Sequence, residues 1–113
     1  MHELSIARSL FEIVKEEAER CGALEVLSIR IKVGALTGIV PESLRFCFTI
    51  LARDTPAQNA EILVETIPVR GFCNACEESS GLKNCEFLCS KCGSRDIKII
   101  SGRELSMEGM EIL

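Results

Sequence analysis

The sequence predicts an α/β fold, in which a small sheet of about three strands carries two helices and is interrupted by a cysteine-rich insert. Three observations support this class. Apolar residues recur at helical spacing in two segments, they alternate with polar residues in others, and two Cys-x-x-Cys pairs precede the last strands. A chain of 113 residues with 47 % hydrophobic content can build one modest core, so the insert needs a metal to hold it together.

The first helix is predicted over residues 3–21. Its apolar residues are spaced by three and four, and two more widen the stripe: Leu4, Ala7, Phe11, Val14, Ala18 and Cys21, then Leu10 and Ile13. Glu3 places an acidic group in the first turn. Gly22 follows at a position where helices commonly stop.

A strand with one buried face is predicted over residues 27–33. Its apolar residues alternate with polar ones: Leu27, Ile29, Ile31 and Val33. A second strand covers residues 60–67. After the cysteines, residues 97–100 and 105–112 are expected to return to the core as strands, and Gly109 is a candidate bulge.

The second helix is predicted between these first two strands. Gly34, Thr37 and Gly38 mark a loop, and Pro41 followed by Glu42 has the form of a first helical turn. The apolar residues Leu44, Cys47, Phe48 and Leu51 then continue the helix, which is expected to end near Asp54.

The expected organisation is one α/β domain with an insertion. Residues 1–69 form its first part, residues 70–96 form the metal-binding module, and residues 97–113 complete the domain. The sequence contains no internal repeat, low-complexity segment or phosphate-binding loop.

Cys73, Cys76, Cys89 and Cys92 carry the strongest chemical signal in the chain. Two residues inside each pair let both thiolates of a tight turn point at one ion, and twelve residues between the pairs let the two turns meet. Four thiolates in a tetrahedral array favour zinc and leave no open position. The sequence therefore predicts a structural zinc ribbon.

Two disulfides are the alternative for these four cysteines. The N-terminus has no basic region followed by an apolar run, and no apolar stretch approaches the roughly twenty residues that span a bilayer. The expected location is therefore cytoplasmic, without a membrane partner, and thiols stay reduced there. Of the remaining cysteines, Cys21 and Cys47 are expected to be buried as small apolar side chains, and Cys85 is a candidate substitute ligand.

The charge distribution argues against a nucleic-acid partner. The chain has a net charge of -4, and residues 70–98 carry five positive and four negative groups: Arg70, Lys83, Lys91, Arg95 and Lys98 against Glu77, Glu78, Glu86 and Asp96. Zinc ribbons nevertheless occur in nucleic-acid binders and adaptors, so such a module is the alternative function, which salt-dependent DNA or RNA binding would support. A rubredoxin-like iron carrier is a further alternative, and its red colour would identify it.

The single histidine of the chain is residue 2. At this position its imidazole, its backbone nitrogen, the amide nitrogen of Glu3 and the α-amine of Met1 can chelate one metal in a plane. Such a set of nitrogen donors suits Ni(II) or Cu(II). The first N-H groups of a helix have no intrahelical acceptor, so their use as ligands breaks no helical hydrogen bond.

Four separate motifs together resemble the HypA/HybF family of nickel metallochaperones. They are M-H-E-L-S-I-A at the N-terminus, K-V-G-A-L-T-G-I-V-P-E-S-L-R-F in the middle, the two cysteine pairs, and G-R-E-L-S-M-E-G-M-E-I near the end. The resemblance spans the whole chain, and the motifs occur in the order and spacing of the family.

The resemblance implies a metallochaperone, not an enzyme, that delivers Ni(II) during nickel-iron hydrogenase maturation and in some organisms to urease. It implies a nickel-linked GTPase and the hydrogenase large subunit, or urease accessory proteins, as partners. The nickel ligands of the family correspond to Met1, His2 and Glu3, and its structural zinc ligands to the four paired cysteines. Some members have further histidines beside the zinc or nickel site, and this chain has none.

Overall fold

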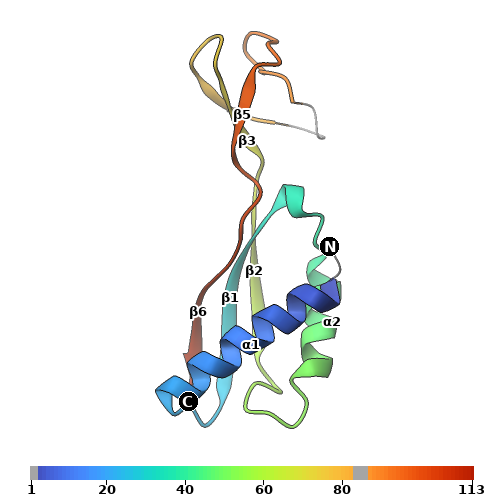
Figure 1. Ribbon diagram of the computed structural model, residues 1–113, viewed down its shortest axis with the longest axis vertical. Coiled ribbons are helices and arrows are strands. Elements are labelled where there is room, and N and C mark those ends of the chain that lie inside the picture. The colour runs from blue at the N-terminus through green and yellow to red at the C-terminus, as the bar shows by residue number, and fades with distance from the viewer. Residues whose placement is uncertain (1–2, 83–86) are drawn as a thin grey trace. The chain divides into compact units, whose positions relative to one another are not determined.

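The computed structural model describes residues 3–82 and 87–113. The chain divides into two compact units, one made of Met1–Ile31, Ile39–Glu65 and Ser106–Leu113, the other of Lys32–Gly38 and Thr66–Leu105. Figure 1 shows the helices and strands of both units. The predicted site residues Met1, His2 and Cys85 lie outside the described residues.

Each of the two sheets has three strands. The first has the order β2-β1-β6, with β2 at Glu61–Ile67, β1 at Val26–Gly34 and β6 at Leu105–Ile112. The second has the order β4-β3-β5, with β4 at Ser79–Gly81, β3 at Arg70–Cys73 and β5 at Ile97–Ser101. With the two helices, these sheets confirm the predicted α/β class with a small sheet and a cysteine-rich module.

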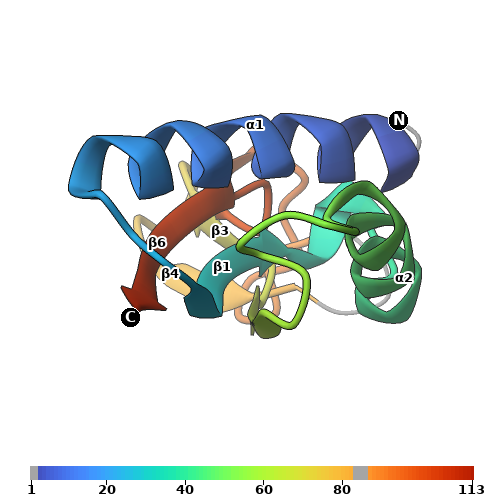
Figure 2. The ribbon, with the colours of Figure 1, turned by 90° about the horizontal axis from the view of Figure 1, so that it is seen from below.

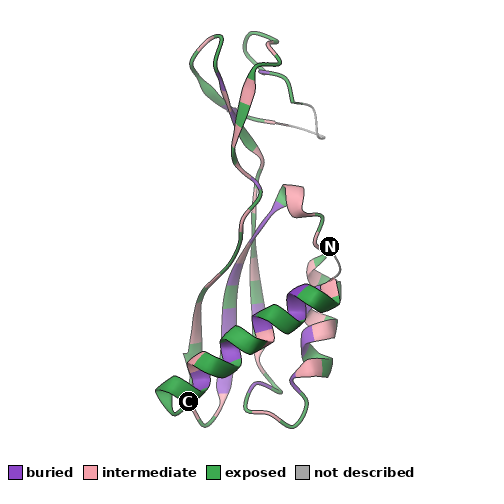
Figure 3. Ribbon diagram, in the orientation of Figure 1, coloured by how far each residue is buried: buried purple, intermediate pink, exposed green. Residues whose placement is uncertain are grey.

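Helix α1 has the predicted bounds, Glu3–Cys21, but its buried face differs from the predicted one. Five residues are buried along one side of the helix: Ile6, Ala7, Leu10, Val14 and Ala18 (Figure 3). Leu4 and Ile13 were predicted to be buried and are exposed, because they lie on either side of the arc that Leu10 and Val14 define. Cys21 is also exposed, since it is the last residue of the helix.

Helix α2, Pro41–Leu51, buries Leu44 and Phe48. The Phe48 ring meets Phe11 of α1 edge to face, with 6.0 Å between the ring centroids. In Figures 1 and 2, α1 crosses the first sheet, and α2 lies next to the start of α1. Neither helix in residues 3–82 and 87–113 is long and apolar enough to cross a membrane.

The predicted end of α2 near Asp54 is three residues too late. The Ala52 N-H donates to the Phe48 carbonyl (2.9 Å) as the last helical bond, and the Thr55 hydroxyl then donates to the Ala52 carbonyl (2.6 Å). Asp54 itself has φ of 60°, in the left-handed region where a right-handed helix cannot continue.

Strand β1 forms the centre of the first sheet. Ile29, Ile31 and Val33 are buried, as expected for a strand with one buried face, but Leu27 was predicted to be buried and is exposed. Val26, on the opposite face, is also buried. The alternation breaks because Ser28 and Ile29 are both buried.

Residues 97–100 were predicted to return to the core sheet, and this is wrong. They form β5, which pairs antiparallel with β3 in the second sheet, with Gly71 opposite Ile99 and Cys73 opposite Ile97. On its other side β3 pairs with β4. Only β6 joins the first sheet, so the two final strands of the chain belong to different sheets.

A close backbone contact joins the end of β1 to the link between β5 and β6. The Gly34 N-H donates to the Glu104 carbonyl and the Leu36 N-H to the Gly102 carbonyl, both at 2.7 Å. A side chain on Gly34 would overlap the carbonyl group of Gly102. Gly34 has an ordinary φ of -72°, so glycine is required there for space and not for backbone freedom.

We predict that Gly34→Ala destabilises the protein by at least about 2 kcal/mol. The added methyl group would overlap the backbone of Gly102 and Arg103, and neither this backbone nor β1 can move away without losing its own contacts. Gly81→Ala is the matched control, since a Cβ there meets no atom within 4 Å. Urea unfolding followed by circular dichroism measures both variants. Equal midpoints for the two variants would contradict this account of Gly34.

Candidate metal centre

The first Cys-x-x-Cys turn is closed by three backbone interactions around Cys73, at the end of β3. The Glu77 N-H donates to the Cys73 carbonyl (2.8 Å), and the Cys73 N-H donates to the Glu78 carbonyl (2.9 Å). The Cys76 N-H points at the Cys73 sulfur, 3.5 Å away. Glu77 follows Cys76 with a left-handed φ of 58°.

The second turn repeats this pattern around Cys89. The Gly93 N-H donates to the Cys89 carbonyl (2.9 Å), and the Cys89 N-H donates to the Ser94 carbonyl (2.8 Å). The N-H groups of Lys91 and Cys92 point at the Cys89 sulfur, each at 3.4 Å. Gly93 has φ of 76°, at the position that Glu77 occupies in the first turn. Two separate stretches of sequence therefore build the same local structure.

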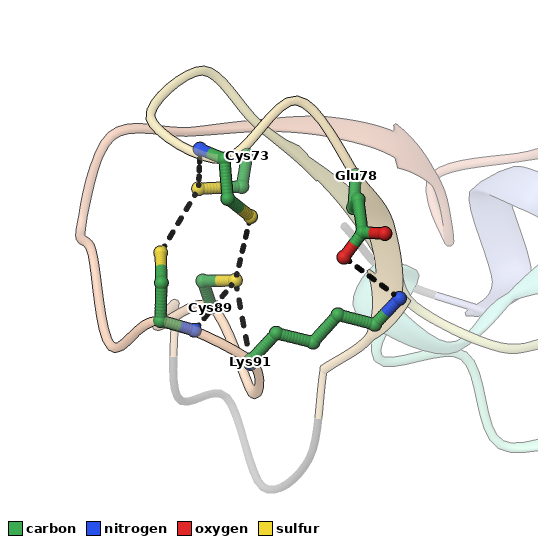
Figure 4. Close-up of polar contacts among 6 residues, drawn as sticks. Cys73, Glu78, Cys89 and Lys91 are labelled. Atoms are coloured by element: carbon green, nitrogen blue, oxygen red, sulfur yellow. Dashed lines mark hydrogen bonds and ion pairs between the residues drawn. The ribbon is translucent and has the colours of Figure 1, made fainter.

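The two turns bring four sulfurs together. The Sγ atoms of Cys73, Cys76, Cys89 and Cys92 all lie within 4.8 Å of one another. Cys73 and Cys92 are 3.6 Å apart, as are Cys76 and Cys89, and Figure 4 shows the sulfurs converging from both turns. Ligands about 2.3 Å from a tetrahedral ion are about 3.8 Å apart, so this spacing fits four thiolates around one metal.

The disulfide alternative is not what the structure shows, because all six described cysteines are free. Cys73 and Cys89 are buried, and Cys92 is exposed. Outside the cluster, Cys47 is partly buried and Cys21 is exposed, so the prediction that Cys21 is buried is wrong. Cys85, the candidate substitute ligand, lies outside the described residues.

The local environment prepares two of the thiols as metal ligands. The N-H groups of Cys92 and Lys91 donate to the Cys89 sulfur and lower the pKa of Cys89 to about 6. The Cys76 N-H has the same effect on Cys73 and lowers its pKa. Burial instead raises the pKa of Cys76 to about 12, so without a metal this thiol stays protonated. A metal binds the thiolate, and each turn therefore offers one N-H-stabilised sulfur to it.

Polar contacts outside the sulfurs join the two turns. Lys91 Nζ lies 3.1 Å from a Glu78 carboxylate oxygen (Figure 4). The Asn74 N-H donates to the Asp96 carbonyl (2.9 Å), and the Asn74 side-chain amide donates to the Asp96 carboxylate (3.1 Å). Because both side chains of the Lys91 pair are about half exposed, that pair contributes no more than about 1 kcal/mol. A metal shared by the four sulfurs would join the turns more strongly than this ion pair.

The donor set defines what the centre can do. Four cysteine sulfurs fill a tetrahedral coordination sphere and leave no position for water or substrate. In residues 3–82 and 87–113, these four cysteines are the group of three or more potential ligands that the fold brings together. The centre can hold a metal and fix the surrounding turns, but it has no site for catalysis.

The structure describes one of the three predicted N-terminal ligands. Glu3 is the first residue of α1 and is partly buried, while Met1 and His2 precede the described residues. Glu3 lines a hollow together with Glu42 and Cys47 of α2. No pattern in the sequence connects these residues, because no periodicity or spacing relates positions that lie so far apart in the chain.

A model of the HypA family, described as a hydrogenase/urease nickel incorporation metallochaperone, matches residues 1–112. The chain is 43 % identical over 113 residues to the hydrogenase maturation factor HypA of Desulfatibacillum aliphaticivorans, covering 99 % of this chain and 87 % of that one. It is 41 % identical over 113 residues to the same factor of Geotalea daltonii, covering 100 % of both chains.

Solved structures share the fold. A solution structure of a HypA protein superposes with a TM-score of 0.74 at 21 % identity, covering 100 % of this chain and 97 % of that one. That of the Ni metallochaperone HypA from Helicobacter pylori gives 0.69 at 21 % identity, covering 100 % and 98 %. The matched family consists of metallochaperones and not of enzymes. This chain belongs to the HypA family of hydrogenase and urease nickel-incorporation metallochaperones.

Proposed function

We propose that this protein binds Ni(II) at Met1, His2 and Glu3 and delivers it during nickel-iron hydrogenase maturation, while zinc at the four cysteines holds residues 70–96 in shape. The observation that carries the proposal is the family match over residues 1–112, which includes both the N-terminus and the cysteine pairs. Urease is a second acceptor class, because the family description names it.

The nickel site uses the chemistry of a helix start. The α-amine of Met1, the backbone nitrogen and imidazole of His2 and the amide nitrogen of Glu3 supply four nitrogen donors, a set that suits square-planar Ni(II). Because α1 begins at Glu3, the amide nitrogens before and at this residue have no intrahelical acceptor to lose. The Glu3 carboxylate adds negative charge beside the cation. A site with few ligands at a chain end can release its metal by ligand exchange.

The zinc site is proposed to retain its metal, whereas the nickel site releases it. Four sulfurs within 4.8 Å of one another fit a closed tetrahedral Zn(II) site, and the N-H donors to Cys73 and Cys89 stabilise the thiolates that zinc requires. Iron fits the same sulfurs, but the family is one of nickel delivery and not of electron transfer, which supports a structural metal.

Nickel delivery requires proteins that exchange the metal with this one. A nickel-linked GTPase of the maturation system and the hydrogenase large subunit are the proposed partners, with urease accessory proteins where urease is the acceptor. We place this exchange in the cytoplasm, where the thiols stay reduced. The net charge of -4 and the family match give no support to a nucleic-acid partner.

We expect the purified protein to hold one zinc per chain and Cys73→Ala to lose it, because structural zinc contributes about 10 to 16 kcal/mol of apparent folding free energy in small modules. Residues 70–96 should then lose their dispersed amide NMR signals while α1 keeps its own. Cys21→Ala removes an exposed cysteine that is not in the cluster and should keep full zinc content. Dispersed signals from residues 70–96 after zinc chelation would show that zinc does not hold this module.

His2→Ala is expected to abolish specific nickel binding, because it removes the single imidazole of the chain. Zinc content and the circular dichroism spectrum should not change. The measurement is the d-d absorption band of square-planar Ni(II), with Ser5→Ala on the exposed side of the first turn as the control. If the His2→Ala protein binds nickel with unchanged affinity and spectrum, the proposed site is wrong.

A tag fused to Met1 should weaken nickel binding or change its absorption band, because it converts the α-amine into an amide. The same histidine-free tag fused to Leu113 leaves the amine in place and should have no effect. Titration of both tagged proteins with Ni(II) gives the comparison. Equal affinities and equal spectra would exclude the α-amine as a ligand.

A further inference from the structure

A hollow of about 430 Å³ lies beside the first turn of α1. It is lined by two residues of α1 and four of α2: Glu3 and Leu4, then Glu42, Ser43, Phe46 and Cys47. Figures 1 and 2 both show the start of α1 next to α2. Glu3, a proposed nickel ligand, therefore forms part of the wall of this hollow.

Large apolar side chains are exposed around the hollow. Phe46 is 67 % exposed and Leu4 is 49 % exposed, and Ile50, one turn beyond Phe46 on α2, is also exposed. Helix α2 buries Leu44 and Phe48, so Phe46 lies on a different face and does not serve the core. An exposed aromatic residue beside a hollow is typical of a surface that binds another protein.

The charge of the hollow is negative. Among the described residues that line it, Glu3 and Glu42 carry carboxylates and none carries a positive charge. Arg45 Nη1 lies 2.7 Å from Glu42, but the Glu42 side chain remains 85 % exposed. The Nε atom of the same guanidinium donates to the Ile62 carbonyl (3.0 Å), which holds Arg45 toward β2. Glu42 can therefore still meet a cation that arrives from outside.

We propose that this hollow binds the nickel-exchanging GTPase partner. An apolar side chain of that partner, flanked by a lysine or arginine, would enter the hollow. The inference rests on the proposed function. Transfer by ligand exchange requires a partner ligand to come within bonding distance of the metal, about 2 Å for nitrogen donors. The partner residues next to that ligand then meet the surface next to Glu3, which is this hollow. Phe46 and Leu4 fit the apolar side chain, and Glu42 fits the cation.

The test uses the full-length, nickel-loaded protein and the GTPase of the same maturation system, with affinity measured by calorimetry. Phe46→Ser and Leu4→Ser should each weaken binding about tenfold or more, as loss of a buried apolar anchor does. Ile13→Ser is the matched control, because Ile13 is on the same helix as Leu4 and is similarly exposed, 46 % against 49 %. It should leave the affinity unchanged. The nickel absorption band of Phe46→Ser should equal that of the unmodified protein, which separates docking from metal binding.

Two further readouts place the partner on the hollow. Glu42→Gln should weaken binding and reduce its dependence on salt, because it removes the charge proposed to face the partner cation. The partner should also slow alkylation of Cys47, which lines the hollow, and leave the exposed Cys21 at the far end of α1 unaffected. Peptide mass spectrometry reads both cysteines in one sample.

Three outcomes would overturn the proposal. If the GTPase binds Phe46→Ser as tightly as the unmodified protein and does not protect Cys47, it docks elsewhere, and nickel binding at the N-terminus stands. If protection of Cys47 arises from a second copy of this chain without the GTPase, the hollow is a dimer interface. If the unmodified nickel-loaded protein does not bind the GTPase, the proposed partner is wrong, and the docking proposal falls with it.

Discussion

The contact between Gly34 and the link from Gly102 to Glu104 is the constraint on which the arrangement of strands depends. Strand β1 of the first sheet ends at Gly34, β5 of the second sheet ends at Ser101, and β6 of the first sheet begins at Leu105. Two backbone hydrogen bonds to this link, both at 2.7 Å, fix the place at which the chain passes from one sheet to the other. A side chain at Gly34 would separate these backbones, so the close approach of the link to the end of β1 depends on a residue with no side chain.

Local patterns predicted much of this fold, and contacts between distant segments account for the errors. The bounds of α1 and the presence of a strand at β1 depend on neighbouring residues, so periodicity identifies them. The pairing of β5 with β3 does not depend on neighbouring residues, and the three isoleucines in residues 97–100 suit either sheet. The exposure of Leu4 and Ile13 also depends on which arc of α1 packs into the core, and a broad apolar stripe does not show this.

The candidate sites also differ in whether local sequence or contacts between distant segments form them. The four cysteines were predictable because each Cys-x-x-Cys turn is a local structure, and the fold needs only to bring two such turns together. The hollow beside Glu3 was not predictable from the sequence, because Glu42, Phe46 and Cys47 meet Glu3 only when α2 packs against α1. The proposed nickel site combines both cases, since its ligands are consecutive in sequence while its surroundings come from another helix. The proposed metal retention and the proposed metal transfer would thus use different structural means in one small chain.

The repeated cysteine turns are alike in hydrogen bonding but unequal in backbone energy. Glycine adopts the left-handed conformation of Gly93 without steric cost, whereas Glu77 holds the same conformation against a cost of about 1 kcal/mol. This strain is confined to the half of the centre that contains Cys73 and Cys76. The two halves of the centre are therefore unequal: the first turn bears a backbone cost that the second does not, and the hydrogen bonds around Cys73 must offset it.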